Sequence, residues 1–137
     1  MLLELGCGSG VTCWRRLRAW PELGVWDRMH RLMLDRLGQQ GRLDWSRAVV
    51  DSVNVRAQRK GEPTGPNPTD RGKAGSKYPV LCDRNGLPLH VLISGANTHD
   101  SKMLAPLLDS NPGGRERAGR PRRRPVKLHA DKQCHHG

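Results

Sequence analysis

The sequence is poor in aromatic residues, with four tryptophans, one tyrosine and no phenylalanine among its 137 residues. Aromatic side chains bury large apolar areas, and only 35% of the residues are apolar. We therefore expect a modest core. No apolar run approaches the roughly 20 residues that cross a bilayer, so the sequence predicts no membrane segment.

The cysteines and the first residues exclude further classes of protein. Residues 1–10 lack the basic start and the long apolar stretch of a signal peptide. The cysteines form no Cys-x-x-Cys pair, which argues against a zinc ribbon and against a disulfide framework. We expect a cytoplasmic protein in a reducing environment. The four cysteines are Cys7, Cys13, Cys82 and Cys134.

Acidic residues are scarce relative to basic ones, because 24 Lys and Arg stand against 13 Asp and Glu and give a formal charge of +11. A field of this sign attracts polyanions over long distances. Nucleic acid is therefore the first partner to consider.

Two segments, residues 54–76 and 111–125, are rich in Gly, Pro and cations and show no periodicity. A connection longer than about 15 residues in a compact domain is usually a functional loop or disordered. Each segment is either a phosphate-binding loop or a flexible, solvated stretch. The cations expected to bind DNA, in these segments and around them, are Arg15, Arg16, Arg18, Arg56, Arg59, Lys60, Arg71, Lys73, Lys77, Arg122, Arg123 and Arg124.

Residues 3–10 (LELGCGSG) look like the first glycine motif of S-adenosylmethionine-dependent methyltransferases. A methyltransferase would need a full βαβ unit with an acidic residue at the end of its second strand. Residues 14–21 instead predict a short basic helix with no β-branched run after it. A methyltransferase fragment therefore stays a lesser alternative.

Two amphipathic helices are expected near the amino terminus. Thr12 is placed to cap a helix over residues 13–20, and Pro21 to end it. Apolar residues at three-and-four spacing predict a second helix over residues 26–37, which a following glycine would stop. The pair is either a hairpin that buries two apolar stripes or part of a DNA-binding module whose arginines contact phosphates.

A short apolar run with one carboxylate in its middle organises the rest of the chain. Residues 48–53 are nearly continuously apolar, as expected for a strand covered on both faces. Asp51 interrupts the run, and a carboxylate in a buried strand costs several kcal/mol unless it is paired or coordinates a metal. In the alternative interpretation, Asp51 lies at the solvent end of the strand and caps a turn with Ser52.

The next expected feature is a β-hairpin. Asn85-Gly86 between the apolar residues 78–82 and 87–94 predicts it, because both turn residues tolerate positive φ. Pro79 is expected near a strand end or at an edge. One face of the second strand should be apolar, through Leu89, Val91 and Ile93.

A helix follows over residues 101–109, capped by Thr98 or Asp100. Metal binding by His99 and Asp100 is the alternative, but an Asp at a helix start ordinarily caps.

The chain closes with an alternating strand over residues 126–131, whose last residue is Asp131. After this strand the adjacent residues Cys134, His135 and His136 make a poor zinc site.

The order of these elements matches the first part of an RNase H-like domain. Several blocks of sequence, in order, resemble DDE transposases of the bacterial insertion-sequence four/five superfamily. Residues 4–17 resemble the end of that family's amino-terminal helical region. The other matching blocks are residues 44–52, 64–73, 75–77, 86–89, 94–101 and 130–132.

The resemblance implies an α/β fold: a partial RNase H-like domain, with a mixed sheet and a central hairpin, preceded by a short helical segment. It also implies a two-metal phosphoryl transfer, with Asp51 and Asp131 as the first and second catalytic aspartates and the ligands of Mg²⁺ or Mn²⁺. The implied partners are DNA at insertion-sequence ends and a second copy of the chain or a full-length transposase.

The sequence departs from the family after Lys132, where the expected continuation and the third acidic ligand are absent. We therefore expect a truncated transposase, inactive alone, or a catalytically dead fragment that binds DNA and inhibits. Residues 1–43 would be a remnant of the helical DNA-binding region, residues 44–132 the first part of the RNase H-like domain, and residues 133–137 a divergent tail.

Overall fold

The computed structural model describes residues 6, 8–58, 61, 63–116 and 121–130. The chain divides into two compact units, Met1–Met33 and Leu34–Gly137. The first unit holds α1 (Gly10–Glu22) and the beginning of α2 (Val25–Gln39), which continues into the second unit. Helix α2 follows α1 with no strand between them, which is not the βαβ order that a methyltransferase needs.

Helix α1 begins earlier and ends later than its sequence predicts. Ser9, not Thr12, is the N-cap, and its side chain accepts a hydrogen bond from the Thr12 N–H. Pro21 lies inside the helix, where only one residue of the helix follows it. A proline this close to the end disturbs few intrahelical bonds, so the predicted stop at Pro21 was wrong.

The apolar side chains of the first unit are not buried as two stripes. No residue of α1 is buried, and Trp14 and Leu17 are largely exposed. The clearest contact is an edge-to-face pair between Trp20 and Trp26, with ring centroids 5.2 Å apart. The interpretation as a hairpin that buries two stripes is therefore wrong for these residues.

Helix α2 buries Leu34 and Gly38 rather than the predicted stripe, whose Leu32 and Met33 are exposed. A Cβ at Gly38 would lie 2.4 Å from the Arg115 carbonyl oxygen, so the glycine lets two backbones meet. The helix ends through Gly41, which has a φ of 67° and donates to the Gly38 carbonyl.

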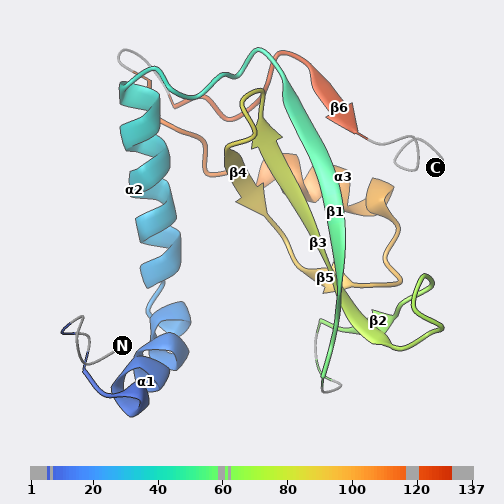
Figure 1. Cartoon of the computed structure of the whole chain (residues 1–137). Coiled ribbons are helices and arrows are strands. Elements are labelled where there is room, and N and C mark those ends of the chain that lie inside the picture. Colours follow the sequence, from blue (N-terminus) through green and yellow to red (C-terminus); the bar gives the residue numbers. More distant parts are fainter. Residues whose placement is uncertain (1–5, 7, 59–60, 62, 117–120, 131–137) are drawn as a thin grey trace. The chain divides into compact units, whose positions relative to one another are not determined.

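The second unit is built on one mixed sheet with the order β2-β3-β1-β6, and β4 and β5 also pair with β3 (Figure 1). Strand β1 pairs antiparallel with β3 and parallel with β6. The expected α/β class with a mixed sheet and a central hairpin is confirmed. The bounds are β1 Ala48–Arg56, β2 Gly65–Pro66, β3 Ala74–Asp83, β4 Pro88–Val91, β5 Ser94–Gly95 and β6 Leu128–Ala130.

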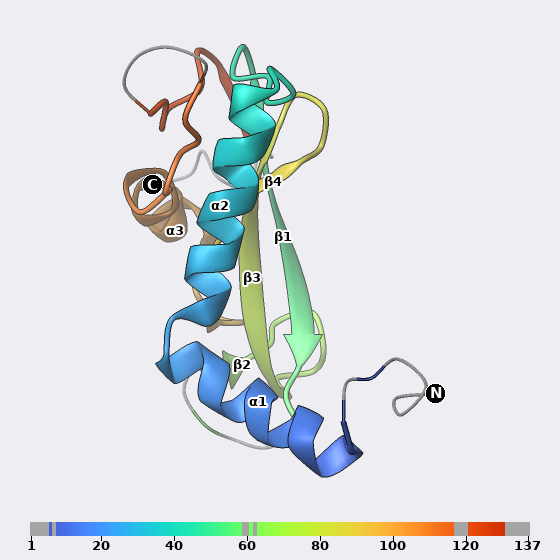
Figure 2. The ribbon, with the colours of Figure 1, turned by 90° about the vertical axis from the view of Figure 1, so that its left-hand side faces the viewer.

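One face of the sheet is covered and the other is open. Helix α3 (Asp100–Asp109) lies along one side of β3 and β1 (Figure 2). The core between them contains Val50, Leu81 and Leu107. On the other face Val53 is 54% exposed, so the prediction of a strand covered on both faces was wrong.

The hairpin forms as predicted, but its details differ. Pro79 is buried in the middle of β3, and its carbonyl accepts from Leu92 in the break between β4 and β5. Pro79 has no N–H to donate, and on that side the neighbouring strand is interrupted between β4 and β5, so no ladder bond is lost. A register shift between Leu81 and Cys82 splits the predicted apolar face, so that Leu89 is buried while Val91 and Ile93 are exposed.

The described parts of both basic segments are held by backbone pairing. Strand β1 continues to Arg56, and β3 begins at Ala74. In the second segment a bridge pairs Gly114 with Arg122, and the buried Asn111 side chain donates to the Arg123 carbonyl at 2.8 Å. Within the described part of the chain, no helix is long and apolar enough to cross a membrane.

Candidate functional site

Asp51 is the fourth of the nine residues of β1, and its side chain points to the open face of the sheet. The alternation along a strand places Val49 and Val53 on the same face. Asp51 is therefore neither a buried charge nor a residue at the strand's end, and both of those interpretations were wrong. A solvated carboxylate on an uncovered sheet face can bind a cation without a large desolvation cost.

The Asp51 carboxylate is held in place by its own backbone. Its Oδ1 accepts a hydrogen bond of 2.8 Å from the Ser52 N–H. The Ala48 N–H donates to the Lys127 carbonyl next to β6, and alternate residues of a strand turn their N–H groups to the same side. The Ser52 N–H therefore faces the β6 side, just past the end of that strand, and it orients Asp51 there.

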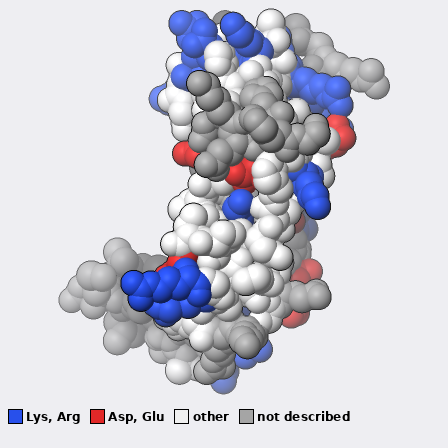
Figure 3. Space-filling view, turned by 90° about the vertical axis from the view of Figure 1, so that its right-hand side faces the viewer, with Lys and Arg blue, Asp and Glu red and all other residues white. Residues whose placement is uncertain are grey.

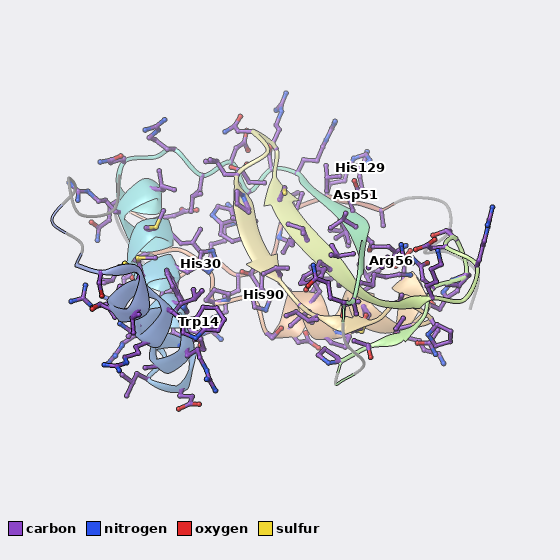
Figure 4. The ribbon with its side chains drawn as sticks, turned by 60° about the horizontal axis from the view of Figure 1, so that its bottom comes forward. Trp14, His30, Asp51, Arg56, His90 and His129 are labelled. Atoms are coloured by element: carbon purple, nitrogen blue, oxygen red, sulfur yellow. The ribbon has the colours of Figure 1, made fainter. Side chains whose placement is uncertain are left out.

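Strands β1 and β6 pair in parallel up to the residue that precedes each predicted aspartate. Val50 is in register with Ala130, and the residues that follow them in the sequence are Asp51 and Asp131. Asp131 itself lies outside the described residues. His129 is in register with Val49, and Figure 4 labels it beside Asp51.

Cys82 shares the open face with Asp51, because it is in register with Val49 on the neighbouring strand. Burial raises the pKa of the Cys82 thiol, and the charges of Asp83 and Asp51 raise it further. The pKa of the thiol therefore depends on the charge of Asp51, and no sequence pattern predicted that the two groups were close.

A second polar cluster lies on the covered face, directly behind Asp51. The Lys77 Nζ is 3.0 Å from Asp100 Oδ1 and donates to the Thr98 carbonyl at 2.8 Å. The Ser52 hydroxyl donates to the same Asp100 oxygen at 3.1 Å. This cluster joins β1, β3 and the start of α3. The sequence predicted Asp100 as a cap, but the cap is His99, whose ring accepts from the Ser101 N–H.

Asp83 is a buried carboxylate that sequence analysis missed. Its two oxygens accept hydrogen bonds from three backbone N–H groups. These bonds fix the hairpin turn and the segment that leads into β1. Its position before Asn85-Gly86 is the only sequence signal, because Asp commonly bonds to the backbone of the turn it begins. The three donors are Asp44, Asn85 and Leu87.

Among the described residues, no three His, Cys, Asp or Glu side chains gather as a complete metal site. Asp51 nevertheless has the chemistry of one ligand of such a site. Its Oδ2 has no hydrogen bond within the described ranges, and carboxylate oxygens are the ligands that Mg²⁺ prefers.

The exposed cations among those predicted to bind DNA lie in three segments of the chain. On the face in Figure 3, Lys and Arg side chains stand in separate groups, some of which lie beside Asp or Glu. Lys77 differs from the other cations because its side chain is 12% exposed and paired with Asp100. Arg59 and Lys60 lie outside the described residues. The exposed cations are Arg15, Arg16 and Arg18 on α1, Arg56, Arg71 and Lys73 near β2, and Arg122, Arg123 and Arg124 before β6.

Comparison with protein families shows that residues 45–130 match the transposase DDE domain. The matched segment is more than half of the chain and runs from just before β1 to the end of β6. The chain belongs to the DDE transposase family. The resemblance seen in the sequence is therefore confirmed, and the mixed α/β sheet is consistent with the expected partial RNase H-like domain.

Two curated relatives come from Burkholderia cepacia. The chain is 55% identical over 65 residues to an uncharacterized 16.2 kDa protein of insertion element IS402, which is 47% of this chain and 44% of that protein. It is 44% identical over 87 residues to the putative transposase of IS402, which is 63% of this chain and 39% of that protein. The chain thus spans less than half of the length of these relatives. No solved structure matches it.

Proposed function

We propose that this chain is part of an insertion-sequence transposase that acts on the DNA ends of its element by metal-dependent phosphoryl transfer. The observation that carries the proposal is the register of β1 and β6, which pairs the residues immediately before Asp51 and Asp131. The family match, whose segment holds Asp51 and ends one residue before Asp131, supports it.

In this proposal Asp51 and Asp131 are two of the ligands of Mg²⁺ or Mn²⁺. When bound, such ions activate the attacking oxygen and stabilise the leaving oxygen of a phosphodiester. The chain's own part is to orient Asp51 through the Ser52 N–H and to leave the sheet face around Asp51 open to DNA. No residue of this sequence is assigned the third acidic ligand.

The basic side chains would hold the DNA. Exposed arginines and lysines neutralise phosphates and release counterions, which makes binding depend steeply on salt. We assign this role to the cations that the sequence predicts other than Lys77, whose charge is already paired with Asp100, with residues 1–43 as the helical DNA-binding part and residues 44–132 as part of the catalytic domain. Residues 133–137 form a tail outside the family pattern.

Mn²⁺ binding and strand cleavage on terminal-repeat DNA test this proposal. The wild-type chain should bind Mn²⁺ weakly, and Asp51→Ala should abolish that binding. Asp70→Ala removes an exposed carboxylate elsewhere in the same unit and should leave it unchanged. Because only Asp51 and Asp131 are assigned as acidic ligands, we expect no cleavage by the chain alone. Mn²⁺ binding that survives Asp51→Ala would show that Asp51 holds no metal.

The net charge of +11 favours a second candidate function, a DNA-binding fragment that occupies element ends or joins a full-length transposase as an inhibitor. DNA binding that survives Asp51→Ala and Asp131→Ala, with loss of cleavage when the chain is added to an active transposase, would support this function. Robust cutting by the chain alone, abolished by Asp51→Ala, would exclude it.

A further inference from the structure

The segment between β2 and β3, residues 67–73, forms a compact turn closed by its own backbone. The Asn67 N–H donates to the Lys73 carbonyl at 2.8 Å, and the Gly72 N–H donates to the Asn67 carbonyl at 2.9 Å. The Asn67 side chain is 5% exposed, and its Oδ1 accepts from both the N–H and the hydroxyl of Thr69. We call residues 67–73 the 67–73 turn. Its conformation is set before any partner arrives.

Close packing anchors this turn to the sheet. A Cβ on Gly65 would lie 1.9 Å from Asn97 Oδ1, so the backbone of β2 is pressed against the Asn97 side chain. A Cβ on Gly75 would lie 3.1 Å from the Val55 carbonyl oxygen and 3.4 Å from the Asn67 Cβ. The two strands that carry the turn therefore have little freedom to move.

Arg71 is the only described residue other than glycine with a positive φ, at 52°. The left-handed region is unfavourable for a residue with a Cβ, and glycine would avoid that cost. Gly72 also has a positive φ, of 71°. Glycine would be more stable than arginine at position 71. Strained backbone of this kind is found preferentially at functional sites, which points to a function for the Arg71 side chain.

The charges around the turn leave Arg71 available. Asp70 lies 3.8 Å from Arg56 Nε and 4.0 Å from Lys73 Nζ, and Figure 4 labels Arg56 at the end of β1. Arg71 is exposed and has no hydrogen bond or ion pair among the described residues. Three cations, Arg56, Arg71 and Lys73, surround the single carboxylate of Asp70. The turn therefore carries an excess of positive charge. A cavity of about 280 Å³, lined partly by Gly65 and Gly72, lies against the turn.

We propose that the 67–73 turn is a preformed contact for the phosphodiester backbone of duplex DNA, and that Arg71 is the side chain that makes the contact. A planar guanidinium on a fixed backbone can bind phosphate oxygens in a bidentate way with little loss of entropy. Asp70 orients the flanking Arg56 and Lys73 without cancelling the charge of Arg71. This inference rests on the proposed function, because it takes DNA as the partner.

Three substitutions at one position separate strain from recognition. Arg71→Gly relieves the backbone and should raise the thermal midpoint by about 4 °C or more. The same substitution should weaken binding to terminal-repeat DNA roughly 3- to 10-fold and reduce the salt slope by about 1. Arg71→Ala should weaken binding equally without the gain in stability, and Arg71→Lys should restore part of it. Arg84→Ala removes an exposed arginine from the other hairpin turn and serves as the matched control.

The results that would contradict the inference differ from those that would contradict the proposed function. Binding by the wild-type chain that Arg71→Gly and Arg71→Ala leave unchanged would overturn the inference while the proposed function stands. Absence of any salt-dependent DNA binding by the wild-type chain would overturn the proposed function as well. If Arg71→Gly does not raise the thermal midpoint, the backbone at Arg71 is unstrained, and the positive φ gives no reason to assign Arg71 a function. An equal loss with Arg84→Ala would show a general effect of charge.

Discussion

The ammonium group of Lys77 lies 3.0 Å from Asp100, and these side chains are only 12% and 19% exposed. Together with the Ser52 hydroxyl, this ion pair fastens the beginning of α3 to the two central strands. It lies on the covered face of β1, where the Ser52 hydroxyl takes part while the Ser52 N–H orients Asp51.

We expect Lys77→Ala to lower the free energy of unfolding by about 1–3 kcal/mol, because Asp100 would stay mostly buried without its counter-charge. The double variant Lys77→Ala, Asp100→Ala should lose less than the sum of the two single variants. Urea unfolding of the four proteins gives the coupling. Arg124→Ala breaks an exposed pair with Asp109 and should cost at most about 1 kcal/mol. Strictly additive losses would show that the pair is not coupled.

Asp83 should be more important for stability than its place in a turn suggests. Replacement by Ala leaves three backbone N–H groups without their acceptor, and we expect a loss of about 2–4 kcal/mol. Asp83→Asn keeps one carbonyl oxygen for Asn85 and Leu87 and should cost less. Chemical denaturation measures both. A loss below about 0.5 kcal/mol for Asp83→Ala would mean that water replaces the carboxylate.

Gly65 should tolerate no side chain, because a Cβ there would meet Asn97 Oδ1. Gly65→Ala is expected to cost about 1–3 kcal/mol through overpacking. Asn97→Gly, combined with it, should recover part of the loss by removing the clashing amide. Gly61→Ala is the control, since nothing lies within 4 Å of that position. Equal thermal midpoints for the Gly65 and Gly61 variants would contradict the packing seen here.

Cys82 should report the charge of Asp51. Burial, then Asp83 and Asp51, raise the pKa of the thiol above its ordinary 9.0, so the folded state favours the protonated form. This contribution to stability is present below pH 9.0 and is lost as the pH rises through the raised pKa.

Asp51→Asn should lower the Cys82 pKa and raise the thiolate fraction, which speeds alkylation by iodoacetamide. Mass spectrometry of the Cys82 peptide follows the reaction at a pH near 9.0. Asp70→Asn, in the 67–73 turn, should leave the rate unchanged. A rate that does not respond to Asp51→Asn would place the carboxylate too far from the thiol.

Local patterns predicted some elements well and others poorly. The Asn85-Gly86 pair predicted the hairpin correctly, because the conformation of such a turn depends on adjacent residues alone. The helix caps were misplaced by a few residues, since Ser9 and His99 compete with equally suitable neighbours. The 54–76 segment showed no period because a compact turn that is held by Asn67 and by close glycine packing needs none.

The sequence by itself determined the family, the strand that carries Asp51 and the hairpin beside it, because these depend on motifs and on alternation along one segment. Tertiary structure decided which face of that strand is covered, that Asp51 is solvated and oriented by Ser52, and that Lys77 pairs with Asp100. It also decided that Arg71 stands free on a fixed turn. These features join residues far apart in the chain, and only the packing of distant segments can select them.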